Sequence, residues 1–167
     1  MESPMNKVAS GEAFKISLSS LSLARQRQIG ARFIANVLDL TDGMCTGQAQ
    51  KIAEKSDVST EELEQAYRAV RAVYVATHPQ SDLSALDYRQ QAAHFVAEAC
   101  MVCVAPTYEQ HRTHHLAEKV AGYCRMARIC SSIQHEEEYP KFVDAEASLK
   151  KEIDAQYRIL NEFLENR

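Results

Sequence analysis

Residues 92–105 read AAHFVAEACMVCVA, and this stretch decides the fold. Twelve of its fourteen side chains are apolar, and the two exceptions are His94 and Glu98. A helix that is apolar all round must be surrounded by other helices, because it has no face to offer to water. Pro106 follows directly and interrupts helical structure. We therefore expect a central helix, running from residue 82 or 84 to about residue 104, in an all-α fold.

Helical periodicity extends outward from this stretch in both directions. Apolar residues recur at spacings of three and four, which is the pattern of amphipathic helices. Ser59 with Glu62 has the spacing of a capping box, and Thr107 with Gln110 repeats it. The long helices are expected over residues 22–38, 59–77, 82/84–104, 108–133 and 140–165, and a short one over 47–55.

The predicted fold class is an all-α antiparallel bundle of five long helices, with or without one short extra helix. Short connections favour antiparallel neighbours, and the 5 Gly and 4 Pro provide little turn chemistry for a many-stranded β protein. Residues 1–20 show little periodicity and are expected to form a loosely ordered N-terminal arm. Residues 21–167 are then expected to form a single helical domain.

Charge and cysteine content exclude several classes of protein. The net charge is −4 and no long run of Lys and Arg is present, so no nucleic-acid partner is expected. Arg25, Arg27 and Arg32 lie within a helical pattern and are interpreted as a solvated face. No apolar run approaches the roughly 18 residues that span a bilayer, so no membrane partner is expected. The five cysteines, without an export signal, predict a cytoplasmic location.

His94 and Glu98 are the most distinctive polar residues, because they interrupt the apolar stretch. They are four residues apart and share one helix face. Burying such a pair is costly unless each group finds a partner, so one interpretation is a core hydrogen bond, with Glu98 paired to Arg125 or Arg128. Other interpretations make the pair half of a metal or acid–base site, or, with Tyr123, the polar end of a ligand pocket.

A second cluster contains three side chains with metal-binding chemistry. His111, His115 and Glu118 follow i, i+4, i+7 spacing and share a face if their helix is continuous. Two imidazoles at that spacing can chelate a transition metal. Glu98 is the favoured further ligand, because Pro106 reverses the chain between the two helices. A solvated face is the alternative, so no cofactor is expected apart from this candidate transition metal.

Cys100 and Cys103 form a Cys-x-x-Cys pair, but the pair lies deep in the apolar stretch. Redox and zinc sites place such thiols at a turn or a helix N-terminus, so we interpret these two as small core residues. The sequence also lacks a Gly-rich phosphate loop and a nucleophile elbow. These absences weaken the case for an enzyme and leave the question open.

Three functions remain open. The first is a non-enzymatic interaction or regulatory protein that binds a protein partner or a second copy. In general character the chain resembles small helical accessory proteins, including toxin-neutralising, immunity-like proteins, although no specific motif carries this resemblance. Glu136, Glu137 and Glu138 are the candidate partner contact, because acidic surfaces steer basic partners. The alternatives are a metal-binding helical bundle with hydrolytic or redox activity, and a small-molecule binder with an apolar pocket between helices.

Overall fold

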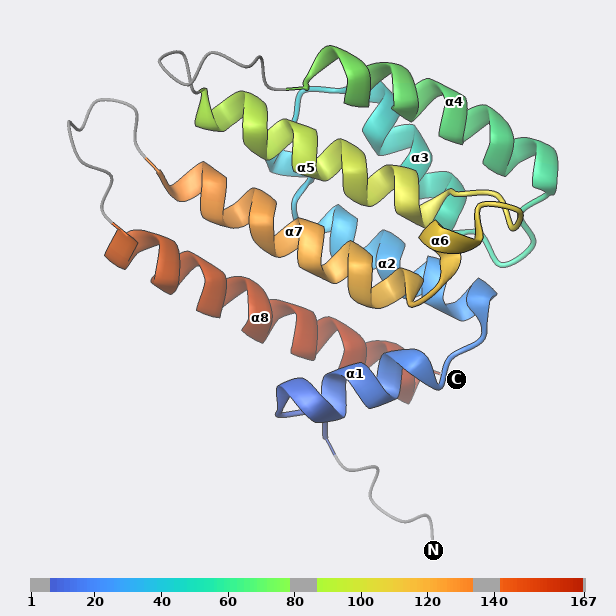
Figure 1. Cartoon of the computed structure of the whole chain (residues 1–167). Helices are drawn as coiled ribbons and strands as arrows, with labels where there is room; N and C mark the ends of the chain where they lie inside the picture. Colours follow the sequence, from blue (N-terminus) through green and yellow to red (C-terminus); the bar gives the residue numbers. More distant parts are fainter. Residues whose placement is uncertain (1–6, 79–86, 134–141, 167) are drawn as a thin grey trace, which may run out of the picture.

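The computed structural model describes residues 7–78, 87–133 and 142–166, excepting the side chains of 142 and 143. In these ranges eight α-helices pack together and no strand occurs (Figure 1), so the prediction of an all-α fold is confirmed. The elements are α1 (Gly11–Ser19), α2 (Leu23–Ala35), the 3-10 helix η1 (Leu38–Leu40), α3 (Met44–Glu54), α4 (Thr60–Ala76), α5 (Tyr88–Cys103), α6 (Gln110–Thr113), α7 (Leu116–Ser132) and α8 (Phe142–Glu165).

Helix α7 lies at the centre of the arrangement. It runs between α5 and α8 in Figure 1, and α2 packs behind it. The contact between α5 and α7 is the most extensive in the fold, and α3 and α4 extend the packing beyond α5. The apolar helix α5 is therefore enclosed, as its composition predicts. No helix in the described part of the chain is both long and apolar enough to cross a membrane.

The five long predicted helices correspond to α2, α4, α5, α7 and α8, but the helix expected over 108–133 is broken. α6 ends at Thr113, and α7 begins only at Leu116. His115 lies between them in a left-handed conformation, with φ of 52°. A continuous helix was therefore the wrong prediction here. The short helices α1, α3 and α6 join the packing, so the architecture is more than a bundle of five.

The two predicted capping boxes have different outcomes. At the start of α4, Ser59 Oγ accepts from the Glu62 main-chain N–H at 3.1 Å. Glu62 Oε2 accepts from the Ser59 N–H at 2.9 Å, so this box is confirmed. The second box is wrong, because α6 begins after Glu109 and has no side-chain cap.

A loosely ordered arm was expected over residues 1–20, but the described part of this range contains a helix. Helix α1 occupies most of this range, capped by the Ser10 side chain, and it buries Phe14 and Leu18. Two large side chains at i, i+4 spacing are enough to dock a short helix, although they give only a weak periodic signal. The Val8 main chain is also tied to Asn161 of α8 by hydrogen bonds of 2.8 and 3.1 Å.

The prediction that the basic residues of α2 form a solvated face is wrong for Arg27, while Arg25 and Arg32 are partly exposed. Arg27 is only 3% exposed and donates hydrogen bonds to the main-chain oxygens of Cys103 and Ala105, at the end of α5. Burial lowers the pKa of Arg27. The guanidinium carbons of Arg25 and Arg32 lie 4.0 and 5.0 Å from the centre of the same aromatic ring, that of the buried Phe163 in α8.

Candidate functional site

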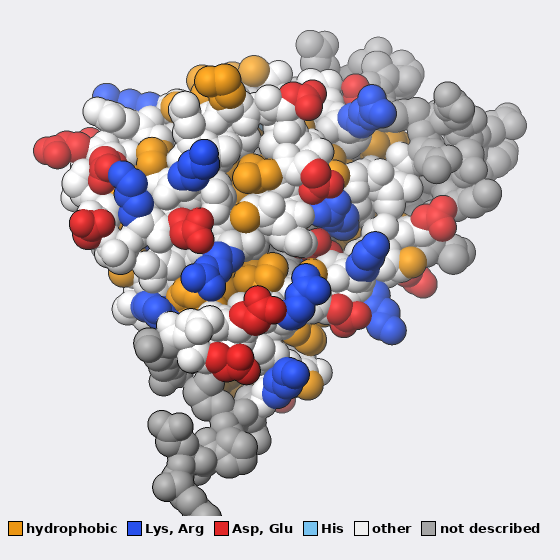
Figure 2. All heavy atoms as spheres, turned by 180° about the vertical axis from the view of Figure 1, so that it is seen from behind, with side chains coloured by type: hydrophobic (Ala, Val, Ile, Leu, Met, Phe, Trp, Pro, Cys, Tyr) orange, Lys and Arg blue, Asp and Glu red, His pale blue; other side chains and the backbone are white. Residues whose placement is uncertain are grey.

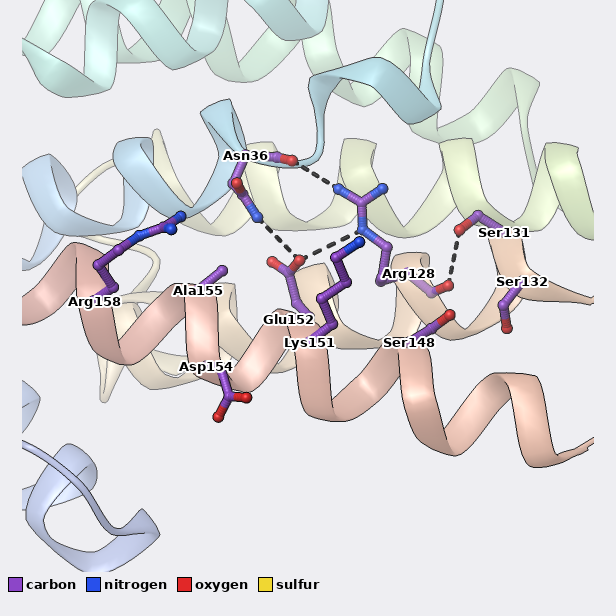
Figure 3. A pocket seen from close by; sticks show the side chains of 10 residues that line it. All are labelled: Asn36, Arg128, Ser131, Ser132, Ser148, Lys151, Glu152, Asp154, Ala155 and Arg158. Atoms are coloured by element: carbon purple, nitrogen blue, oxygen red, sulfur yellow. Dashed lines mark hydrogen bonds and ion pairs between the residues drawn. The ribbon is translucent and has the colours of Figure 1, made fainter.

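A polar groove runs between α7 and α8 beside the C-terminal end of α2 (Figure 3). It has a volume of about 660 Å³, within the range of about 300–1,000 Å³ that is usual for ligand pockets. The residues that line it are Asn36, Arg128, Ser131, Ser132, Ser148, Lys151, Glu152, Asp154, Ala155 and Arg158. We call this the α7–α8 groove.

Glu152 is the buried carboxylate of the groove, with a side chain only 2% exposed. Its Oε2 accepts hydrogen bonds from Asn36 Nδ2 at 3.0 Å and from Arg128 Nε at 3.4 Å. Its Oε1 is buried without a hydrogen bond of regular geometry, although the Gln156 side chain lies close enough to favour the charged form. Burial raises the pKa of Glu152, while Asn36, Arg128 and Gln156 oppose this shift.

Arg128 is fixed by several acceptors at once. It makes bonds of 3.1 and 3.2 Å to the two Asp39 carboxylate oxygens and one of 2.7 Å to the Asn36 main-chain oxygen. Burial alone would lower the pKa of Arg128, but Asp39 and Glu152 outweigh it and the pKa is raised. Arg128 therefore stays charged and forms a rigid wall of the groove, because its guanidinium donors are already engaged.

Lys151 and Arg158 form the basic edge of the groove. Both are exposed, and among the described residues neither has a hydrogen bond or an ion pair. They are seven residues apart, or about two turns, and so lie on one face of α8. Asp154 lies between them, and the lining as a whole contains three cations and two carboxylates. The available positive charge therefore lies at the edge, while the charge of Arg128 is neutralised inside.

Ser131 and Ser132 contribute hydrogen-bonding groups to the groove. Ser131 Oγ donates to the Arg128 main-chain oxygen at 2.8 Å, and Ser132 Oγ donates to that of Ile129 at 2.6 Å. Their hydroxyl hydrogens are thus engaged, and their oxygens remain as acceptors. The lining therefore provides charges and hydrogen-bonding groups.

His94, expected to stand out, lies in the packing between α4 and α5. It is 7% exposed, and its Nδ1 lies 3.1 Å from Thr77 Oγ1. Its ring stacks on Tyr74, with centroids 4.4 Å apart. Burial lowers the pKa of His94, and the nearby Glu98 opposes the shift. This geometry corresponds to the interpretation of His94 as a hydrogen-bonded core residue.

Glu98 has a different partner from the one expected. The Tyr123 hydroxyl lies beside it, and the pKa of Tyr123 is raised, first by burial and then by Glu98. Arg125 Nε instead donates to Gln156 Oε1 at 2.7 Å, and Arg128 is held by other acids. The predicted pairing of Glu98 with either arginine is wrong, because both arginines are directed toward α8.

The candidate metal ligands lie on either side of the break between α6 and α7. Glu118 forms an ion pair with Lys15 at 3.5 Å, and His111 Nδ1 lies 3.4 Å from Glu109 Oε2. His115 is the left-handed residue at the break, so the shared helix face was a wrong prediction. Within the described ranges no three His, Cys, Asp or Glu side chains are grouped to hold a metal.

The predicted acidic patch, Glu136, Glu137 and Glu138, lies outside the described residues. The interpretation of Cys100 and Cys103 as core residues is confirmed, since both are fully buried. Their Sγ atoms lie 3.7 and 3.3 Å from main-chain oxygens, and burial raises both thiol pKa values, that of Cys103 to about 12.

Glu152 and Gln156 are buried polar residues of α8 that sequence reasoning missed, as it missed Lys151 and Arg158 at the edge of the groove. Glu152 and Gln156 occupy the same buried stripe of α8 as Ala145 and Leu160. A search for apolar periodicity favours the neighbouring Ile153, because a stripe is expected to be apolar throughout. The sequence did contain a signal for their burial. Glu152 and Gln156 continue the spacing of three and four residues that the buried positions of α8 follow.

On the opposite side of the molecule from the view of Figure 1, charges of both signs are interspersed and hydrophobic side chains form small groups (Figure 2). That face shows no large region of one sign. Comparisons with models of protein families, with curated proteins and with solved structures find no match to this chain.

Proposed function

We propose that this chain is a non-enzymatic binding protein that receives an acidic segment of a protein partner in the α7–α8 groove. One observation carries the proposal. Lys151 and Arg158 are exposed at the edge of the groove and have no partner among the described residues, whereas the inner Arg128 and Glu152 are bonded to each other. A carboxylate at either edge residue gains a charge-assisted hydrogen bond, and Arg158 can bind one through two donors.

The spacing of the two cations favours a peptide over a compact anion. Seven residues of helix span about 10.5 Å, so a single small anion does not contact Lys151 and Arg158 together. An extended chain covers that distance in about three residues. Two carboxylates spaced along a partner segment therefore match the groove.

The net charge of −4 opposes an acidic partner at long range, so recognition is local and sensitive to salt. Neutralisation of a toxin is one form that such binding takes, and the cytoplasm is its expected location, supported by five free thiols. A small-molecule ligand is the second candidate, favoured by the volume of about 660 Å³.

The test is a titration of the ¹⁵N-labelled full chain with a polyglutamate peptide at low salt. We expect shifts concentrated on residues lining the groove. The double variant Lys151→Glu/Arg158→Glu should weaken binding about tenfold or more, because attraction becomes repulsion. The matched control is Lys51→Glu/Arg71→Glu, which makes the same change of charge at exposed positions of α3 and α4.

Two results would overturn the proposal. Equal binding by the groove variant and the control would show that only net charge matters. A separate titration with inorganic phosphate distinguishes the small-ligand alternative. If phosphate binds in the groove more tightly than the peptide, the site serves a compact anion.

A further inference from the structure

A second, apolar slot lies on the outer side of α7. Its lining includes Gly122, Tyr123, Met126 and Ile129, together with Leu149 of α8, and its volume is about 430 Å³. Lys119 and Arg125 also line it. This side of α7 faces away from α2, because α2 packs against the opposite side of α7 at Val120. We call it the Gly122 slot.

Gly122 is not required by the protein's own packing. At Gly30 of α2, by contrast, an added Cβ would lie 3.1 Å from Cys103 Sγ and 3.5 Å from Val120, so that glycine permits close helix packing. At Gly122 an added Cβ would meet no atom of another described element within 4 Å. Glycine inside a helix is less favourable than alanine, and no contact within the described part of the chain offsets that cost.

Met126 projects beside this hollow. It is 42% exposed and lies one turn after Gly122, on the same face of α7. Methionine is flexible and fills irregular gaps well. A hollow and a projection four residues apart on one helix are self-complementary. If two copies of α7 cross antiparallel about a twofold axis near position 124, each Met126 lies over Gly122 of the other copy.

We propose that a second copy of this chain docks on the Gly122 slot, forming a weak symmetric dimer through α7. Within its own chain the Lys119 ammonium group donates to the His111 main-chain oxygen, and the same axis places Lys119 near Ile129 of the second copy. There Glu146, an exposed residue one turn before Leu149 on α8, offers the opposite charge. Twofold symmetry supplies each of these contacts twice, as in other isologous interfaces.

Stable interfaces bury roughly 1,200 Å² or more, whereas this contact is made by a few side chains of α7 and α8. Self-association is therefore expected only at high protein concentration. This inference is independent of the α7–α8 groove, which lies on another side of α8. The Lys151→Glu/Arg158→Glu variant should consequently dimerise like the wild type, and the two proposals can fail separately.

Sedimentation equilibrium of the full chain at rising concentration, up to millimolar, is the test. Gly122→Leu fills the hollow and Met126→Ala removes the projection. Each should raise the dissociation constant about tenfold or more. The monomer should stay folded in both variants, because a side chain added at Gly122 meets open space and Met126 is 42% exposed. Met44→Ala is the matched control, since Met44 is 78% exposed on α3 and lies away from the slot.

A charge exchange tests the orientation of the two copies. Lys119→Glu and Glu146→Lys should each weaken the dimer, and the double variant should restore it. The proposal is overturned if the wild type stays monomeric throughout, if the Gly122 and Met126 variants dimerise like the wild type, or if Met44→Ala weakens the dimer equally. Failure of the double variant to restore the dimer would overturn the antiparallel arrangement.

Discussion

Arg27 and Cys103 are joined by two hydrogen bonds, one in each direction. Arg27 Nη1 donates to the Cys103 main-chain oxygen at 2.8 Å, and Cys103 Sγ donates to the Arg27 main-chain oxygen at 3.3 Å. Arg27 Nη2 adds a bond of 2.6 Å to the Ala105 oxygen. The last carbonyls of a helix lack partners within it and carry partial negative charge. A buried guanidinium therefore satisfies the C-terminal end of α5 without a carboxylate.

Replacing Arg27 by methionine tests this role. Arg27→Met keeps most of the volume but removes both charge-assisted hydrogen bonds, so we expect the free energy of unfolding to fall by about 2–4 kcal/mol. Urea unfolding followed by circular dichroism measures the change. Arg71→Met, at an exposed position of α4, should change it by no more than about 0.5 kcal/mol. Equal losses in the two variants would contradict the assignment.

Glu152→Ala should also destabilise the fold, because it removes the acceptor for Asn36 and Arg128 inside the α7–α8 groove. We expect a loss of about 2–4 kcal/mol, below the upper range for buried pairs because Arg128 is 23% exposed. Chemical denaturation gives the value. Glu146→Ala, on the exposed face of α8, is the control and should be nearly neutral. A loss for Glu152→Ala as small as that of the control would show that this carboxylate contributes nothing to stability.

His94 predicts a specific dependence of stability on pH. Burial lowers its folded-state pKa below the ordinary value of 6.5, so the unfolded chain binds the proton more readily. Stability from neutral His94 is therefore fully present above about pH 6.5 and is lost as the pH falls toward the folded-state pKa. In His94→Gln the unfolding free energy should fall less between neutral and mildly acidic pH. An unchanged slope would contradict the prediction.

Glu152 changes the unfolding free energy with pH in the direction opposite to His94 over part of the acidic range. The two residues therefore provide a check on each other. Its folded-state pKa is raised above the ordinary 4.5, so the folded chain binds its proton more readily. That contribution is fully present below about pH 4.5 and is lost as the pH rises through the folded-state pKa. Glu152→Gln should therefore make the acid-side loss of stability steeper, whereas His94→Gln makes it shallower.

The left-handed conformation of His115 predicts that replacing it by glycine will not destabilise the fold. Its φ of 52° is strained for a residue with a Cβ. We expect His115→Gly to leave the unfolding free energy unchanged or to raise it by up to about 1 kcal/mol. His114→Gly is the matched control, because His114 has φ of −67°, and it should lower stability by about 0.5–1 kcal/mol. The same loss in both variants would show that the strain is absent in solution.

Local and strongly periodic features could be predicted from the sequence. The apolar stretch around Cys100 required an enclosed helix, and the structure encloses it on several sides. Ser59 and Glu62 predicted the start of α4, because a capping box depends only on neighbouring residues. The burial of Cys103 followed from the same apolar pattern.

Features that depend on long-range partners could not be predicted. Arg27 and Glu152 have polar side chains in helical patterns, and only their partners distant in sequence make them buried residues. The break at His115 has the same origin, because Gln26 Oε1 accepts a hydrogen bond from the Ala117 N–H and so fixes where α7 begins. Sequence periodicity reports which face is apolar and does not report such contacts.

Gln26 and Arg27, adjacent in α2, hold the start of α7 and the end of α5 respectively. The segment between those helices, residues 104–115, is therefore anchored at both ends by a third element rather than by its own length. Lengthening such a segment costs only chain entropy, about 0.6 kcal/mol for each doubling. This connection is consequently the place to graft a foreign loop, such as an epitope or a fluorescent reporter, without displacing the two central helices.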